Sequence, residues 1–512
     1  MERRALSSGL EDRDDAGQES ESDADFPFAT IITVRQRPYW YQRKGRRAMG
    51  VCLANQWRQS PREDQMSISR RSFLKTAATA SAVGVLAACV PAAPSADGEA
   101  AAESIKIVFV TTESSDSSAV LYDPIKTEFQ EENPEIEIEF LGVVGAGGWG
   151  GYFDKLSVII AGGETVDMGK IPTEGGRLAV ARNLIRPLDE YIQATPELDD
   201  YFNDVSAELA SVFVYGGKTY GLPYDYNNMM IWFNITRLAE EGLEMPPEDW
   251  TFGDFREYAA ALTRKDGANT THYGFSFWTS PFGLCPWLFN NGLEGIMGGD
   301  DLSVPLQGDP AYAEVIQLLY DMMYVDETVP KPDAQNTGNF EAGTQAMMMA
   351  GRWPLSGFLQ NDFRDWDVQY WPKGTRRVTE VGCGSWPIFL ASEHPEAAWK
   401  FETKLLQRDS IAYFVSTGAN IPSLRSVGYS EEFLALHDRS GRLWYESIDR
   451  DDIPVMSVTS PPEFSEMEQI SNRYLSQVFA NELGIAEALA STEQELNDMV
   501  ARRPEDWAAK FA

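Results

Sequence analysis

Cysteine and histidine are scarce in this sequence of 512 residues. The chain has four cysteines and three histidines, which are Cys52, Cys89, Cys285, Cys383, His272, His394 and His437. Their spacing matches no zinc site, and the acidic residues form no calcium-loop pattern, so no metal site is expected. Cys285 and Cys383 could form a disulfide, but their separation along the chain leaves that pairing open.

Basic residues are also few relative to acidic ones. The chain contains 43 Lys and Arg against 78 Asp and Glu, which gives a net charge of −35. Residues 1–88 hold 14 of the basic and 11 of the acidic residues, so the remaining chain carries −38. Such a charge repels phosphate groups and anionic lipid surfaces. We therefore expect no nucleic-acid partner, and a neutral or cationic ligand is favoured.

No apolar run is long enough to span a membrane as a permanent helix. The apolar stretch at 77–86 is short and contains mostly small residues. It follows the pair Arg70 and Arg71 and precedes Cys89. A charged segment followed by a short apolar segment and a small-residue site is typical of an export signal and not of a core helix.

Two motifs in this region resemble known processing signals. SRRSFLK at 69–75 resembles the twin-arginine export motif, and LAAC at 86–89 resembles a lipoprotein signal-peptidase site. The resemblance implies a signal peptide at 66–88 and a lipid on the thiol of Cys89. Durable anchoring requires more than one acyl chain, and a lipoprotein of this kind can carry a further chain on its amine.

The remaining N-terminal segments follow from this interpretation. Residues 1–65 are expected to be a wrongly assigned or disordered extension, because Met66 directly precedes the motif. Residues 89–103 comprise the lipidated cysteine and a tether rich in Ala, Pro and Ser. The folded body would lie outside the cytoplasm, in the periplasm or on the outer face of the cell membrane, with the lipid anchor as its membrane contact.

Hydrophobic periodicity after residue 103 alternates between two patterns. Apolar or period-two runs indicate strands at 104–110, 135–144 and 165–171, and period-3.6 runs indicate helices at 122–132, 152–163 and 175–192. This alternation predicts the α/β fold class, with a parallel sheet at its beginning.

Further helices are indicated later in the chain. A capping-box pattern of Thr251 and Asp254 starts a helix within 249–267, and Gly267 is expected to end it. The other two helices are expected at 394–407, with Pro395 in the first turn, and at 484–501.

Several separated segments have a family resemblance when taken together in their order and spacing. They lie at 215–243, 246–263, 340–355, 381–406 and 416–427. They resemble an extracellular solute-binding protein of a carbohydrate ABC transporter, of the family 1 type. The resemblance implies a two-lobed, periplasmic-binding-protein-like fold with a ligand cleft between the lobes and a hinge. The lobes would be 104–222 plus 370–422, and 223–369 plus 423–512.

The resemblance also implies a function. Such a protein is not an enzyme and needs no cofactor; it captures a carbohydrate, here expected to be an oligosaccharide, and delivers it to the permease of an ABC importer. It is expected to act as a monomer. The hinge is expected at 221–229, because Gly221 and Pro223 end the first α/β run and an apolar strand begins just after.

Aromatic residues make up 12% of the chain, and several stand in glycine-rich, proline-rich or polar segments. A sugar ring offers a flat C–H face to aromatic rings and a rim of hydroxyls to polar groups. The candidate stacking residues are Trp149, Tyr224, Trp278, Trp353 and Trp386. The candidate hydroxyl partners are Glu113, Asp167, Asp225 and Arg352. By contrast, Trp232 and Trp399 lie on periodic apolar segments and are expected in the core.

Three other functions remain open. GAGGWG at 145–150 matches a dinucleotide-binding fingerprint with Asp167 as the ribose-binding acid, so an exported NAD(P)-dependent oxidoreductase is an alternative. Against it, the fingerprint does not follow the first strand, and Trp149 would obstruct the phosphates. A polysaccharide hydrolase would need two paired carboxylates, which no pattern identifies. Within the binding-protein interpretation, a polyamine or other cation is the alternative ligand.

Overall fold

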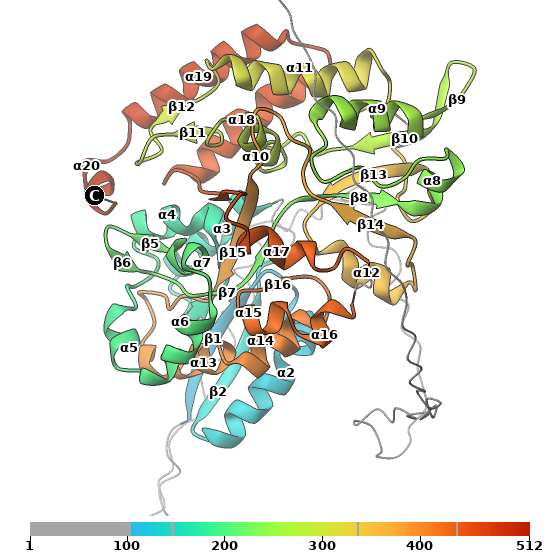
Figure 1. Ribbon diagram of the computed structural model, residues 1–512. Coiled ribbons are helices and arrows are strands. Elements are labelled where there is room, and N and C mark those ends of the chain that lie inside the picture. The colour runs from blue at the N-terminus through green and yellow to red at the C-terminus, as the bar shows by residue number, and fades with distance from the viewer. Residues whose placement is uncertain (1–103, 145–147, 335–336, 437–438, 512) are drawn as a thin grey trace, which may run out of the picture. The chain divides into compact units, whose positions relative to one another are not determined.

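The computed structural model describes residues 104–144, 148–334, 337–436 and 439–511, which belong to one compact unit (Figure 1). The predicted N-terminal extension, signal peptide, lipidated Cys89 and tether lie outside the described residues. Among the residues that the structure describes, no helix is both long and apolar enough to cross a membrane.

A three-stranded parallel sheet opens the fold, as the alternating pattern predicts. β1 (Ile105–Thr111) lies between β2 (Ile136–Gly142) and β3 (Met168–Gly169) and pairs in parallel with both. The two crossover helices are α2 (Ser115–Glu132) and α3 (Trp149–Ala161). The second half of β1 is buried on both faces, which explains its continuous apolar sequence.

The helix predicted at 175–192 is in fact two shorter helices. α4 (Thr173–Ala181) ends before Asn183, which adopts a φ of 54°, and α5 (Asp189–Gln193) begins after Pro187. Asn tolerates this left-handed conformation, and Pro has no N–H with which to continue a helix. The apolar pattern across this break therefore reflects burial of an extended segment and not a single helix.

The helix predicted within 249–267 begins as expected and ends earlier. α9 (Phe252–Leu262) starts with the predicted capping box, in which Thr251 and Asp254 bond each other's backbone N–H groups. Gly267 does not end the helix. It lies in the turn of a hairpin that follows, with a φ of 60°. A glycine with positive φ serves a hairpin turn as well as a helix end, so the sequence signal was ambiguous.

Two later helices and two core residues agree with the predictions. α13 (Pro395–Leu405) has Pro395 at its first turn, and α19 (Ile485–Ala501) matches the late amphipathic segment. Trp232 and Trp399 are buried, with exposed fractions of 0% and 6%.

Two further sheets follow the first. The central sheet comprises β4 (Ile171–Pro172), β7 (Pro223–Asn227), β15 (Thr379–Ser385), β16 (Ile421–Pro422) and β17 (Val455–Ser457), in the order β16-β7-β15-β17 with β4 on β15. The other comprises β8 (Met230–Asn234), β9 (Arg264–Asp266), β10 (Asn269–Ser276), β13 (Gln345–Ala350) and β14 (Trp366–Gln369), in the order β14-β8-β13-β10-β9. The chain passes from one sheet to the other through Asn228 and Met229, within the predicted hinge segment 221–229.

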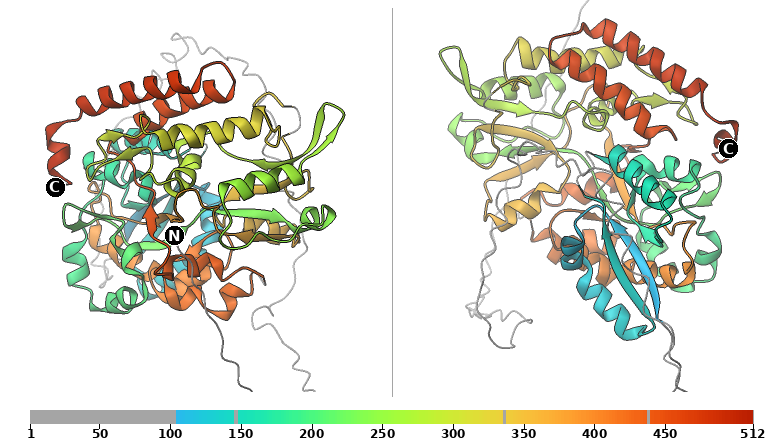
Figure 2. Two further views of the ribbon diagram at one scale, coloured as in Figure 1. Left: turned by 45° about the horizontal axis from the view of Figure 1, so that its top comes forward. Right: turned by 180° about the vertical axis from the view of Figure 1, so that it is seen from behind.

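The other elements surround these sheets. The helices are η1 (Pro196–Leu198), α6 (Asp199–Asp204), α7 (Ala207–Ser211), α8 (Ile235–Glu240), α10 (Pro281–Asn290), α11 (Pro310–Tyr324), α12 (Pro354–Gln360), α14 (Arg408–Val415), α15 (Arg425–Gly428), α16 (Glu431–Leu434), α17 (Leu443–Asp449), α18 (Phe464–Phe479) and α20 (Glu505–Ala509). The short strands are β5 (Val214–Tyr215), β6 (Lys218–Thr219), β11 (Met297–Gly298) and β12 (Val304–Pro305). α18 and α19 pack together and lie beside α11 (Figure 2), and α18 also contacts α3.

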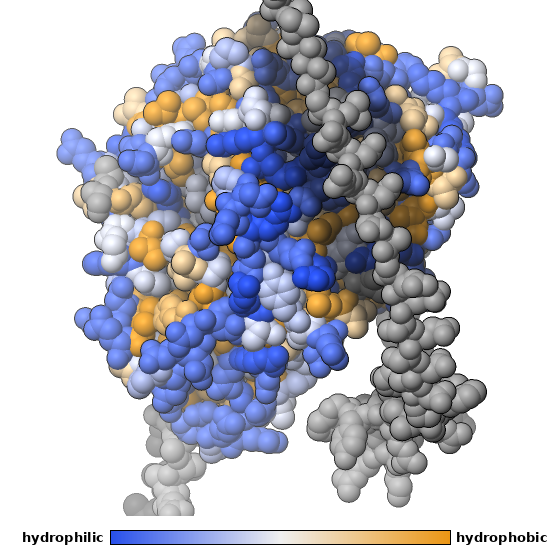
Figure 3. Space-filling model, viewed as in Figure 1, coloured by the Kyte–Doolittle hydropathy of each residue, from blue (hydrophilic) through white to orange (hydrophobic). Residues whose placement is uncertain are grey.

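The two cysteines of the described body are free thiols, and both are buried. Cys285 lies in α10 and Cys383 in β15. The disulfide that the sequence left open is therefore not formed. On the face shown in Figure 3, hydrophilic residues cover much of the area and apolar residues form scattered patches.

Candidate functional site

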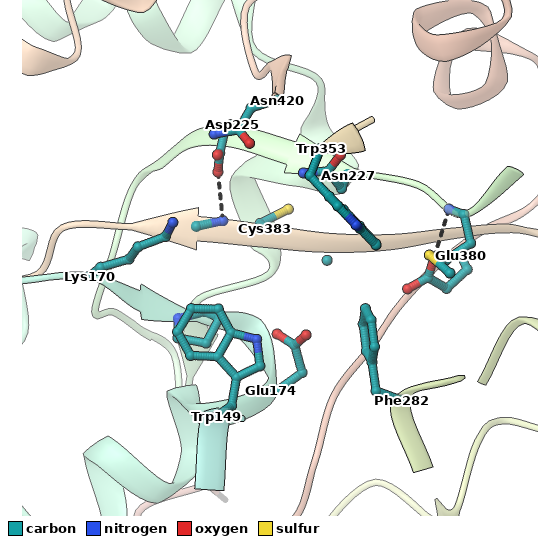
Figure 4. Close-up of a pocket in the computed structure, with 14 residues that line it drawn as sticks. Trp149, Lys170, Glu174, Asp225, Asn227, Phe282, Trp353, Glu380, Cys383 and Asn420 are labelled. Carbon is teal, nitrogen blue, oxygen red and sulfur yellow. Dashed lines mark hydrogen bonds between the residues drawn. The ribbon is translucent and has the colours of Figure 1, made fainter. Parts of the chain in front are cut away.

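A cavity of about 310 Å³ lies against the central sheet (Figure 4). One side of it is β15, where Gly382, Cys383 and Gly384 line the space. β7 runs antiparallel to β15 and brings Asp225 and Asn227 to the same cavity. The rest of the lining comes from α3, α4 and α10, from the segment before α12, and from the loops beside them. Residues of both predicted lobes therefore line one space.

The contact between β7 and β15 is close because Gly384 has no side chain. Its backbone N–H donates a 3.0 Å hydrogen bond to Asp225 Oδ1, the bond drawn in Figure 4. A Cβ atom on Gly384 would lie 2.6 Å from that oxygen and 3.0 Å from the Tyr224 ring. The glycine thus allows the carboxylate of Asp225 to rest on the strand and to face the cavity.

Three aromatic rings form walls of the cavity. Trp149 stands at the first position of α3, Phe282 in the first turn of α10, and Trp353 directly before α12. Trp278 does not line the space but stacks at 5.7 Å on Trp353 and at 6.1 Å on Phe282. These rings offer the flat apolar faces on which a sugar ring stacks.

Three carboxyl groups also line the cavity, and all are nearly buried. They are Glu174 in the first turn of α4, Asp225 in β7 and Glu380 in β15. Burial raises their pKa, to about 7 for Glu174, about 6 for Asp225 and about 8 for Glu380. Such groups accept hydrogen bonds from sugar hydroxyls when ionised and can also donate one when protonated.

The acids are held by short-range hydrogen bonds. The Thr173 hydroxyl donates to Glu174 Oε2 at 3.2 Å, and the Met229 N–H donates to Glu380 Oε2 at 3.0 Å. Lys170 contributes a positive charge to the lining, which partly offsets the effect of burial on the pKa values of Asp225 and Glu174. These contacts fix the carboxyl groups in place before any ligand arrives.

Two amide side chains complete the polar lining. Asn227 Oδ1 accepts a 2.7 Å hydrogen bond from the backbone N–H of Arg352, and the guanidinium of Arg352 donates to the carbonyl of Asn420 at 2.7 Å. Arg352 itself is buried, with its guanidinium over the Phe433 ring, and burial lowers its pKa to about 9. Arg352 therefore supports Asn227 and Asn420 from behind the cavity.

The structure brings some of the predicted site residues together. Trp149, Asp225 and Trp353 line the cavity, and Trp278 stacks behind Trp353. Glu113 lies next to the lining, with Oε1 3.9 Å from the ammonium of Lys170.

Other predicted site residues lie in the interior. Tyr224 and Trp386 are buried and stack on each other at 3.5 Å, with an angle of 5° between their rings. Asp167 is fully buried; its carboxylate accepts hydrogen bonds from the Val108 N–H at 2.8 Å and from the Ser392 hydroxyl at 2.6 Å. Both oxygens of Asp167 are thus engaged in joining β1 to the chain after β15, and the buried carboxylate does not face the cavity where a ribose could reach it. Residues 145–147 of the fingerprint lie outside the described residues.

Several lining residues were missed at the level of sequence. They are Lys170, Glu174, Asn227, Phe282, Glu380 and Asn420. Lys170 and Glu174 had a usable signal, because they flank the junction between a predicted strand and the following helix, where α/β folds place their ligands. Glu380 had none, because its position depends on the pairing of β15 with strands distant in sequence.

Comparison with known proteins agrees with this architecture. Residues 125–436 match the family described as bacterial extracellular solute-binding proteins. The chain is 25% identical over 347 residues to a protein of Brucella abortus (strain 2308) described as a binding protein, covering 63% of this chain and 77% of that protein.

Solved structures share the fold at low sequence identity. The ABC substrate-binding protein Lmo0181 of Listeria monocytogenes, in complex with cycloalternan, has a TM-score of 0.68 and 22% identity, covering 78% of this chain and all of that one. The sugar-binding protein MalE of Xanthomonas citri has a TM-score of 0.64 and 17% identity, covering 80% of this chain and all of that one. The fold is therefore the two-lobed fold of periplasmic binding proteins.

Proposed function

We propose that this chain, which belongs to the bacterial extracellular solute-binding proteins, captures an oligosaccharide and delivers it to the permease of an ABC importer. The observation that carries the proposal is the cavity at the central sheet. Trp149 and Trp353 give it aromatic walls, and Asp225, Glu174 and Asn227 give it polar groups for hydroxyls. Aromatic faces combined with converging acceptors and donors suit the two chemically different surfaces of a sugar.

The comparisons support a carbohydrate as the ligand. One structural relative is a substrate-binding protein in complex with cycloalternan, and another is a sugar-binding protein. An enzyme is not favoured, because the matched family and these relatives are binding proteins.

Capture would use closure of the two lobes. Trp149 precedes the predicted hinge in the chain, whereas Phe282 and Trp353 follow it, so bending at 221–229 would change the distance between the walls. A ligand that contacts both walls binds the closed form better and shifts the population toward it. Small-angle scattering is expected to show a smaller radius of gyration at saturating sugar, and an unchanged value would contradict closure.

Anchoring would place the binding body at the membrane. The motifs at 69–75 and 86–89 support twin-arginine export and a lipid on Cys89. A Cys89→Ser variant is expected to leave the membrane fraction, whereas the wild-type protein stays in it. Continued membrane association of the variant would contradict the anchor without affecting the proposed ligand.

The decisive experiment is a thermal-shift panel on the purified protein. Oligosaccharides of different linkage, single polyamines and nucleotides are tested separately, because a ligand that binds the native state raises the unfolding temperature. We expect a shift with one class of oligosaccharide. A shift with spermidine or NAD(H) and none with any sugar would contradict the proposed function.

A further inference from the structure

The cavity contains more acidic than basic groups. Glu174, Asp225 and Glu380 are each more than nine-tenths buried, and Lys170 is the basic residue among the lining side chains. The ammonium of Lys170 lies 3.9 Å from a further carboxylate, that of Glu113. Among the described residues, none of the three lining carboxyl groups has a Lys, Arg or His nitrogen within 4.0 Å. The lining therefore contains carboxyl groups that no described basic side chain pairs with.

Glu174 and Glu380 are the least compensated of these groups. Glu174 accepts a hydrogen bond from the Thr173 hydroxyl and is also influenced by its own backbone N–H, and Glu380 accepts one from the Met229 N–H. A carboxylate can accept about four hydrogen bonds, so both groups have acceptor positions to spare. In Figure 4, the carboxyl group of Glu174 points into the cavity between the rings of Trp149 and Phe282.

The surrounding aromatic rings suit a positive charge as well as a sugar face. An ammonium within about 6 Å of an aromatic ring centre is attracted by the electron-rich face of the ring. Lys170 already shows this arrangement, with its ammonium 6.0 Å from the Trp149 ring centre. Trp353 and Phe282 also line the cavity and have no basic side chain over their rings among the described residues.

From this combination we propose that the ligand is an amino sugar, a carbohydrate whose protonated amine lies against Glu174 and Glu380 while its ring stacks on Trp149 or Trp353. The proposal rests on the proposed function and names the substrate class of that site. A neutral sugar would leave two buried acids without a positive partner, so they would have to stay protonated or bear the cost of a buried unpaired charge. The net charge of −35 would also draw a cationic ligand toward the body.

Proton release on binding is a consequence of this pairing. Burial raises the pKa of Glu174 to about 7 and that of Glu380 to about 8, so near neutral pH both groups bind protons in part. An adjacent ammonium favours the ionised form, and the protons leave as the ligand binds. The other ionisable groups whose interactions with Glu174 or Glu380 influence these equilibria are Lys170, Glu468, Tyr215, Cys285 and Cys383. Lys170 alone among them opposes the rise in pKa.

Calorimetric titration of the purified protein tests the ligand class. The probes are matched sets that differ in one substituent: glucosamine, N-acetylglucosamine and glucose, the corresponding galactose and mannose sets, and the β-1,4-linked trimers of the first three. We expect the amine member of one set to bind at least about tenfold more tightly than its neutral partners. We also expect an enthalpy that varies with the ionisation enthalpy of the buffer, which reports proton release.

The failures of the two proposals are distinguishable. Equal or tighter binding of the neutral members would overturn the amine and leave the oligosaccharide function standing. The amine is also overturned, and the oligosaccharide function also stands, if none of these sugars binds but other neutral oligosaccharides respond in the thermal-shift panel. Absence of binding by every sugar in both experiments would overturn both proposals.

Two charge-removing variants locate the amine. Glu380→Gln and Glu174→Gln keep the shape of the cavity and are each expected to weaken amino-sugar binding by about tenfold or more and to reduce proton release. Glu402→Gln is the matched control, because Glu402 is fully buried in α13 and lies outside the cavity lining. Thermal unfolding of each variant verifies folding. Unchanged affinity and proton release in both folded cavity variants would overturn the placement of the amine.

Discussion

Trp353 and Trp386 stand in similar sequence surroundings and have different positions in the fold. Each follows a glycine by two residues, Trp353 after Gly351, which directly follows β13, and Trp386 after Gly384 near the end of β15. Trp353 is half-buried and forms a wall of the cavity. Trp386 is 1% exposed and lies in the core, stacked face to face on Tyr224.

The neighbours of each ring explain the difference. Trp386 is surrounded by Phe109, Tyr122 and Phe414, which come from β1, α2 and α14. Trp353 contacts Trp278, which is itself partly exposed, and is only partly packed against the core, so that it also forms a wall of the cavity. A tryptophan after a glycine is therefore a site residue only where no other layer of the fold covers it. Four predictions test this comparison.

The largest effect is expected from Trp386→Ala. Removing a fully buried ring that is in contact with other rings leaves a cavity, and the free energy of unfolding is expected to fall by about 3–5 kcal/mol. Denaturant unfolding measures this value. Trp353→Ala serves as the comparison, with an expected loss below about 2 kcal/mol because its ring is only half-buried. Equal losses in the two variants would contradict the distinction.

The substitutions Gly384→Ala and Gly351→Ala are expected to affect different properties, the first mainly stability and the second mainly ligand binding. In Gly384→Ala, the new Cβ would meet Asp225 Oδ1 at 2.6 Å, against buried groups that cannot easily move. We expect a loss of stability of about 2–3 kcal/mol. In Gly351→Ala, the Cβ would meet the ring of Trp353 at 2.1 Å, and a half-buried ring can shift. That variant is expected to lose ligand affinity more than stability, as measured by titration and unfolding together.

A smaller effect on binding is expected from Trp353→Ala itself. Loss of one stacking ring is expected to weaken binding of the responding sugar by about 1–3 kcal/mol, or about 5- to 150-fold. Trp353→Phe retains an aromatic face and is the matched control, with a smaller loss. If both variants bound the sugar as tightly as the wild-type protein, Trp353 would have to be regarded as a core residue like Trp386.

The last prediction concerns the pH dependence of stability on the cavity side, where a slope is measured and not a loss at one pH. Burial raises the pKa of Glu380 to about 8 in the folded protein. At pH values between the unfolded pKa and 8, the folded state therefore binds more protons at this group than the unfolded state does. This group therefore makes the protein less stable as pH rises toward 8, by up to about 1.4 kcal/mol per pH unit. Glu380→Gln removes that contribution. We expect its unfolding free energy to fall less steeply than that of the wild-type protein between pH 5 and 8; parallel curves would contradict the raised pKa.

The local elements of the fold followed from sequence where residues close together decide the structure. The capping box at Thr251 and Asp254 and the first-turn proline at 395 were correctly interpreted because each acts over one helical turn. The helix predicted at 175–192 was wrong because Asn183 and Pro187 override hydrophobic periodicity. Periodicity reports which residues are buried, and an extended segment can bury the same residues as a helix.

The candidate site was only partly accessible from sequence. Aromatic residues in loops pointed to Trp149 and Trp353, which line the cavity. Glu380 gave no signal, because its carboxyl group faces the cavity only once β15 has paired with β7 and β17. Asp167 gave a misleading signal toward a ribose, because its partners Val108 and Ser392 are distant in sequence.

The sequence by itself determined the α/β class, several of the helices and strands, the acidic charge and the resemblance to solute-binding proteins, since each depends on composition or on residues within a few turns of one another. The tertiary structure alone decided which aromatic rings are open to a ligand and which acids share one cavity. Exposure and charge pairing depend on which distant segments approach a residue. At the cavity, the backbone of β15 brings Gly384 and Glu380 to residues more than a hundred positions away.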